Sequence, residues 1–172
     1  MITRVIYFEK DNILYQKVID LEADINEIDK VSLSTIMLDN SVNIPQPCID
    51  ISSNARHMRE LSPYNVKCVT GQNIKEMWDS LDKCRDKKDL PPGSHELLYI
   101  KSLSERQAYI ILNTGSFYDV YYSPRGDKGS PAKACACFKL LAKQNKLDYI
   151  LDMNKFLWWY YANCSHPIRW DN

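Results

Sequence analysis

The chain has 172 residues, with 22 basic and 22 acidic side chains and a formal net charge of zero. This balance argues against a strongly basic nucleic-acid-binding protein, and a composition with 45% hydrophobic residues excludes a disordered chain. A chain of this length buries enough surface to fold as one globular domain, residues 1–172, without a metal, a cofactor or disulfide bonds.

The N-terminus has no basic region followed by a long apolar segment, so we expect no secretory signal. The longest apolar runs, such as residues 156–162, are much shorter than the roughly 20 residues that cross a bilayer. Six cysteines in a chain expected to lack a signal indicate free thiols in a reducing compartment. The sequence therefore predicts a cytoplasmic protein with no membrane partner.

The first predicted element is a β-hairpin. Residues 2–9 and 13–19 are rich in β-branched and aromatic side chains, and Asp11-Asn12 between them suits a tight turn.

An acidic segment follows at residues 20–29, with five carboxylates and no basic side chain. As a helix, this segment would place Asp20, Asp24 and Glu27 together on its outer face. Such a face accelerates encounters with a basic surface. Two interpretations stay open: a docking site for a basic protein partner, and a helix face that contacts only solvent.

Residues 40–65 contain three prolines and predict a long irregular connection with one turn at 57–61. A short strand is predicted at 66–70. A helix is predicted at 72–87, where a single apolar stripe is formed by Ile74, Met77, Trp78, Leu81 and Cys84. It ends before the breaker cluster at 90–93.

Three strands are predicted next, at 96–101, 107–113 and 116–123. Their short links favour an antiparallel meander, because parallel neighbours need a longer crossover.

A helix is predicted at 131–146, with Ser130 as N-cap and Pro131 at the first helical position. Its inward side chains are expected to be Ala134, Cys137, Phe138 and Leu141. The aromatic tail, residues 154–170, suits either the core or an interface. The predicted fold class is α+β: an N-terminal hairpin, an antiparallel meander, and two or three packing helices.

The loop between the last strand and the last helix admits a binding function. Its glycines allow close backbone approach to a ligand, and a helix N-terminus adds partial positive charge. An anion site there would use Arg125, Lys128, Ser130 and Lys133. The alternative is a charged turn, because the loop lacks the glycine spacing and the ending of a P-loop.

Cysteines near the C-terminus suggest two further kinds of chemistry. Cys135, Cys137, Cys164 and His166 are all potential zinc ligands, but residues two apart on a helix are separated by about 200°. Cys135 with His166 as base would resemble a thiol enzyme, yet Cys135 lies beyond the first helical turn, where the dipole effect fades. We therefore expect no metal site and no catalytic residues.

The leading functional prediction is a non-catalytic intracellular protein-binding domain, of the inhibitor or immunity-protein kind, that masks a charged macromolecule. It depends on the acidic set Asp20, Asp24 and Glu27 and a basic surface on the partner. The alternative is a small phosphate- or nucleotide-binding enzyme or sensor that uses residues 124–133.

Overall fold

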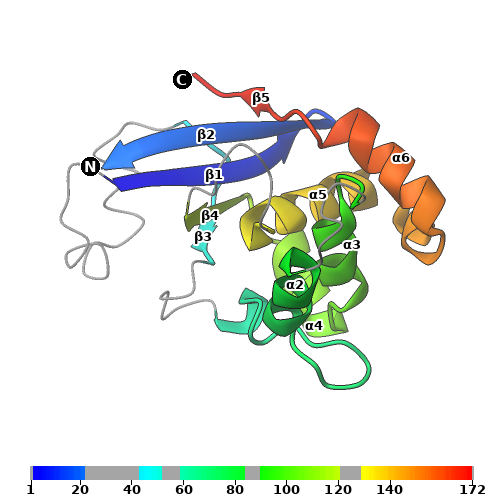
Figure 1. Cartoon of the computed structure of the whole chain (residues 1–172). Coiled ribbons are helices and arrows are strands. Elements are labelled where there is room, and N and C mark those ends of the chain that lie inside the picture. The colour runs from blue at the N-terminus through cyan, green and yellow to red at the C-terminus, as the bar shows by residue number, and fades with distance from the viewer. Residues whose placement is uncertain (1, 22–42, 52–58, 84–89, 121–128, 172) are drawn as a thin grey trace.

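The computed structural model describes residues 2–21, 43–51, 59–83, 90–120 and 129–171 (Figure 1). Predictions for other positions, including most of 20–29, 84–87 and 121–128, lie outside these residues. The elements in chain order are β1 (Ile2–Lys10), β2 (Ile13–Leu21), β3 (Cys48–Asp50), η2 (Arg59–Leu61), α2 (Ile74–Asp82), α3 (Ser94–Lys101), α4 (Glu105–Leu112), β4 (Ser116–Val120), α5 (Pro131–Lys143), η4 (Leu147–Leu151), α6 (Met153–Asn163) and β5 (Ile168–Arg169).

The strands form one sheet in the order β3-β4-β1-β2-β5. β1 pairs antiparallel with β2 and β4, whereas β3 joins β4 and β5 joins β2 in parallel. The α+β class is therefore confirmed, but the sheet is mixed and not a pure antiparallel meander. Its strand pairs, except β1 with β2, join segments that are distant in the sequence.

The N-terminal hairpin is confirmed, with Lys10 opposite Ile13 at its closed end. Asp11 and Asn12 have φ angles of 53° and 65°, which is the geometry of a type I′ turn. The carboxylate of Glu9 accepts a hydrogen bond from the Asn12 N–H at 2.9 Å and stabilises this turn.

The two strands predicted at 96–101 and 107–113 are wrong, because both segments are helical, in α3 and α4. Short apolar runs rich in Ile, Leu and Tyr fit a buried strand and a buried helix equally well. At α4 a capping box decides between them. The Ser104 side chain accepts the Gln107 N–H, and the Gln107 side chain accepts the Ser104 N–H.

The predicted helix at 72–87 is confirmed over α2, where Asn73 is the N-cap and accepts the Glu76 N–H at 2.9 Å. The strand predicted at 66–70 is wrong, because that stretch contains a single bridge, between Lys67 and Asn73. The predicted connection at 40–65 includes β3 and η2, and η2 lies within the turn expected at 57–61.

The predicted helix at 131–146 is confirmed as α5, although it ends at Lys143. Asn145 adopts a left-handed φ of 60°, and the N–H groups of Asn145 and Lys146 bond back to Ala142 and Leu141. This hydrogen-bond pattern terminates the helix three residues before the predicted end. The expected inward residues are all buried: Ala134, Cys137, Phe138 and Leu141.

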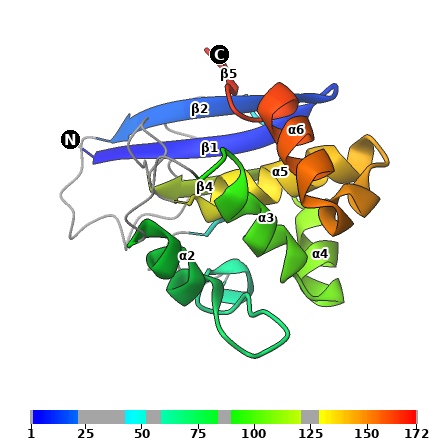
Figure 2. The same cartoon turned by 45° about the vertical axis from the view of Figure 1, so that its right-hand side comes forward.

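The helices lie against one face of the sheet, with α5 next to β1 and β4 and α3 packed on α5 (Figures 1 and 2). Phe117 belongs to the main core on this face, and Tyr118 belongs to a smaller cluster on the opposite face. That cluster also contains Phe8 of β1 and Trp170, which follows β5. Among the described residues, no helix combines the length and apolar character that a bilayer crossing needs.

Candidate functional site

The aromatic residues of the C-terminal tail divide between the two sides of α6. Phe156, Trp159 and Tyr160 are 0%, 4% and 3% exposed and belong to the core. Trp158 and Tyr161 are 76% and 61% exposed. Residues three apart are neighbours on a helix surface, so these two rings share the outer face of α6.

Two more apolar side chains are exposed where α6 begins: Leu151 at 84% and Met153 at 62%. We call the set Leu151, Met153, Trp158 and Tyr161 the α6 surface. It extends from the end of η4 along α6, a helix at the periphery of the molecule (Figure 2).

The buried side of α6 is fixed by specific polar contacts. Trp159 Nε1 donates to Gln144 Oε1 at 2.8 Å, and the Tyr160 hydroxyl donates to Glu96 Oε1 at 3.1 Å. Asp152 caps the helix by accepting the N–H groups of Asn154 and Lys155. The α6 surface is therefore presented by a helix that is anchored to the core and capped at its start.

A second feature is a pocket of about 480 Å³ between α2 and the start of α5. Its apolar lining includes Ile51, Pro63, Trp78 and Pro131, of which Ile51 and Trp78 are 1% and 4% exposed. Tyr64 also lines the pocket, and about half of its surface is exposed to solvent.

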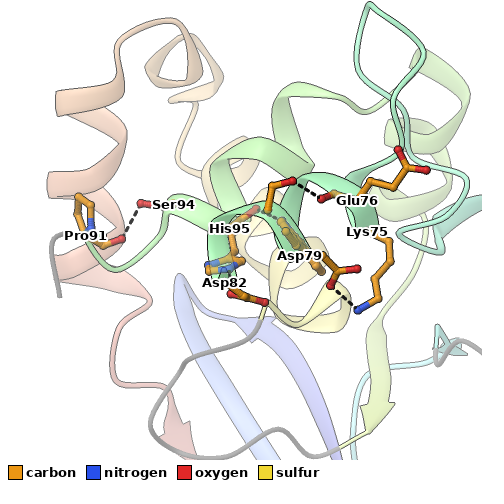
Figure 3. Close-up of polar contacts among 9 residues, drawn as sticks. Lys75, Glu76, Asp79, Asp82, Pro91, Ser94 and His95 are labelled. Atoms are coloured by element: carbon orange, nitrogen blue, oxygen red, sulfur yellow. Dashed lines mark hydrogen bonds and ion pairs between the residues drawn. The ribbon is translucent and has the colours of Figure 1, made fainter. Parts of the chain in front are cut away.

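The α2 wall of the pocket is charged, because Lys75, Asp79, Asp82 and Lys83 follow one another at helical spacing. Lys75 Nζ lies 3.0 Å from Asp79 Oδ1, and His95 Nε2 lies 3.0 Å from Asp82 Oδ1. Figure 3 shows these side chains along α2, with His95 reaching Asp82 from α3. Lys75 and Asp79 are thus partners on the same helix, and Asp82 contacts His95 of α3.

Trp78 connects this wall to the core. Its Nε1 donates to the carbonyl oxygen of His95 at 2.9 Å, and its ring stacks on Tyr99 at 6.0 Å between centroids. Gly129 lies against the indole, because a Cβ at that position would be 2.9 Å from three ring atoms. The glycine at the start of α5 therefore allows close packing on Trp78.

Asp119 lies at the N-terminus of α5, lines the pocket and is 0% exposed. Its Oδ2 accepts hydrogen bonds from the Ser130 hydroxyl and the Ala132 N–H, each at 3.3 Å. A carboxylate at this position is stabilised by the positive end of the helix dipole. The partial positive charge at the start of α5, which was predicted to attract an external anion, is thus already compensated by the Asp119 carboxylate.

The residues predicted for an anion site are only partly described. Ser130 caps α5 by accepting the Lys133 N–H at 3.2 Å, while Lys133 Nζ lies 5.1 Å from the centroid of the Tyr160 ring. Arg125 and Lys128 lie outside the described residues. The structure therefore does not bring the four predicted residues together around one point.

The predicted acidic set is described only at its first member. Asp20 belongs to β2, opposite Thr3 of β1, so the helix expected from residue 20 does not include it. The strong β-pairing of the hairpin extends further than its apolar pattern indicates. Asp24 and Glu27 lie outside the described residues.

The cysteines of α5 have different neighbours, as their separation around a helix requires. Cys135 Sγ lies 3.4 Å from the Tyr99 hydroxyl, and burial raises the pKa of its thiol. Burial also raises the pKa of Cys137, and a hydrogen bond with Cys164 raises it further. His166 is exposed, and no group of three potential metal ligands is present in the described part of the chain.

No protein-family model matches this sequence, and no curated protein matches it significantly. The α6 surface and the pocket are therefore the two features of this molecule that indicate a function. The α6 surface has a signal in the sequence, because helical spacing separates Trp158 and Tyr161 from Phe156 and Tyr160. The pocket has none, because its lining comes from five separate segments.

Proposed function

We propose that the protein is a non-catalytic binding domain that contacts a protein partner through the α6 surface. The observation that supports this is the pair Trp158 and Tyr161, which expose 76% and 61% of their surface on one side of α6. Trp and Tyr are enriched among the residues that contribute most to binding free energy. Burying them against a partner removes apolar surface from water.

The setting of α6 favours binding of a preformed surface. Because Trp159 and Tyr160 are hydrogen-bonded in the core, the backbone that carries Trp158 and Tyr161 needs no ordering on association. Tyr and Trp also lose little side-chain entropy for the area that they bury. The partner is therefore expected to offer an apolar groove for the two rings.

The first test uses variants of the α6 surface. A partner captured from the native cells with the whole protein is purified, and its affinity is measured by calorimetry. The double variant Trp158→Ala, Tyr161→Ala is expected to weaken binding at least about 30-fold, because each such residue can contribute 2 kcal/mol or more. Tyr109→Ala is the matched control, because Tyr109 is 69% exposed on α4. Equal affinity of the double variant and the wild type would refute the proposal.

The charge of the partner is a separate part of the proposal. The acidic set Asp20, Asp24 and Glu27 would meet a basic surface, as an inhibitor or immunity-type antagonist masks a charged macromolecule. Reversing these three charges is expected to slow association at low salt, with a smaller effect at high salt. An association rate that does not change at low salt would exclude a role for this set.

The alternative function, a small phosphate- or nucleotide-binding enzyme or sensor, would use residues 124–133, of which Gly129 and Pro131 line the pocket, although Asp119 already accepts hydrogen bonds at this end of α5. An enzyme or sensor of that kind would show a higher melting temperature with phosphate or ATP, and Arg125→Ala would remove the effect. No shift with either ligand would exclude it.

A further inference from the structure

We infer that the pocket between α2 and the start of α5 binds a small organic cation, a primary amine or guanidine with a short aliphatic body. The inference is independent of the α6 surface. A volume of about 480 Å³ is typical of small-molecule sites, which combine apolar walls with a few polar groups.

The apolar part of the pocket suits the aliphatic body of such a ligand. Ile51 and Trp78 are almost fully buried, and the two proline rings, Pro63 and Pro131, complete this surface. Tyr64 keeps about half of its surface exposed while lining the pocket, so its ring is accessible to a cationic group.

The hydrogen-bond acceptors lie on α2. Asp79 and Asp82 are three residues apart, line the pocket together, and use Oδ1 for their contacts with Lys75 and His95. Within the described residues, Oδ2 of both carboxylates has no hydrogen-bond partner. A carboxylate accepts several hydrogen bonds, and bonds from ammonium or guanidinium groups are the strong ones.

The charge of the lining favours a cation over an anion. Among the lining residues that the structure describes, three carboxylates, from Asp79, Asp82 and Asp119, face two ammonium groups, from Lys75 and Lys83. Lys75 is already paired with Asp79. The start of α5, which would otherwise attract phosphate, is occupied by the buried carboxylate of Asp119. The Ala132 N–H, which an anion at this helix start would use, therefore already donates to Asp119.

The test measures melting temperature and calorimetric affinity with agmatine, putrescine and spermidine, and with phosphate and ATP at the same ionic strength. We expect a saturable increase in melting temperature with at least one of the three cations. Asp79→Asn and Asp82→Asn should each weaken its affinity roughly 10- to 100-fold, the range for one charged hydrogen bond.

Lys83→Gln is the matched control, because it removes a charge of the opposite sign from the same wall of the pocket. It is expected to strengthen cation binding, and the Trp158→Ala, Tyr161→Ala variant is expected to leave it unchanged. The Asp79 side chain is about half exposed, so Asp79→Asn is expected to fold normally even if Asp82→Asn fails to fold. Three results would overturn the inference: no shift with any of the cations, a shift that survives both Asp variants, or a shift with phosphate or ATP alone.

Discussion

Gly129 illustrates how one residue type has more than one physical explanation. From the sequence, the glycines of this loop are interpreted as positions where a ligand approaches the backbone. In the structure, the group that approaches Gly129 is the Trp78 indole, at 2.9 Å from an ideal Cβ. Both a ligand at the backbone and the packed indole require a residue without a side chain. Sequence alone cannot separate them, because the indole comes from a helix that ends about 50 residues earlier.

Gly129→Ala is expected to destabilise the protein by about 1–3 kcal/mol, the cost of inserting a methyl group into a packed interior. Urea denaturation provides the measurement. The control is Gly71→Asn, because Gly71 has a φ of 89° and no atom within 4 Å of an ideal Cβ. This variant therefore creates no clash, and its cost is the backbone strain of a side chain at that φ, which is smallest for Asn. A Gly129→Ala variant as stable as the wild type would show that the Trp78 contact is not tight.

At the scale of elements, local signals are readable in the sequence. The Asp11-Asn12 turn and the N-cap at Ser130 were predicted because each signal lies within a few consecutive residues. The capping box at Ser104 is equally local, and its Ser-x-x-Gln pattern identifies α4. We predicted a strand there because Tyr109, Ile110 and Ile111 favour strands. The cap was the more informative signal.

The pairing of strands that are distant in the sequence cannot be predicted from local sequence signals. β3 and β5 have three and two residues, and their parallel partners lie far away in the sequence. The aromatic tail poses a similar problem, because contiguous rings at 156–161 suit a core and an interface equally. Helical spacing separates buried Tyr160 from exposed Tyr161, but it can be applied only once the segment is known to be a helix.

Gln107→Ala is expected to destabilise the protein by about 1–3 kcal/mol, because it removes two hydrogen bonds to backbone carbonyl groups and the acceptor of the Ser104 N–H, and each such bond contributes about 0.5–1.5 kcal/mol. Gln107 Nε2 donates to the carbonyl oxygens of Glu60 and Asn65, at 2.8 and 3.1 Å. Hydrogen exchange of residues 60–66 should also become faster, since the side chain ties this segment to α4.

The control for this prediction is the neighbouring residue. Arg106 also contacts Glu60, at 2.7 Å, but its side chain is 77% exposed. Ion pairs in solvent contribute little to stability, so Arg106→Ala should leave the urea midpoint nearly unchanged. Equal losses for the two variants would mean that the Gln107 network is not important.

At the scale of the whole molecule, the core holds several groups that keep their protons. Burial raises the pKa of Tyr99 and Tyr160 above the ordinary value of 10.0, and that of Cys135 and Cys137 above 9.0. In the unfolded chain these groups ionise at their ordinary values. The folded state therefore binds more protons than the unfolded state at alkaline pH.

The free energy of unfolding is consequently expected to fall as the pH rises above about 9, and to be unaffected by these groups below it. Each group contributes up to about 1.4 kcal/mol per pH unit. Urea denaturation between about pH 9 and 11 measures the slope. Cys135→Ala should make this slope less steep, by the contribution of one ionisable group.

Cys68→Ala serves as the comparison, because hydrogen bonding to Thr70 lowers the pKa of that exposed thiol. Cys68 loses its proton at lower pH in the folded state than in the unfolded state, so it does not contribute to the loss of stability at alkaline pH, and its removal should not make the slope less steep. A slope that Cys135→Ala and Cys68→Ala change equally would contradict a buried, protonated Cys135.

The strand order has a consequence for synthesis on the ribosome. β1 lies at the centre of the sheet, yet its second neighbour, β4, begins at Ser116. At 5–20 residues per second, translation of the roughly 100 intervening residues takes about 5–20 s. During that interval the nascent hairpin has an open edge beside β1, which attracts other strands. A ribosome-associated chaperone that shields this edge should therefore improve the yield of correctly folded protein.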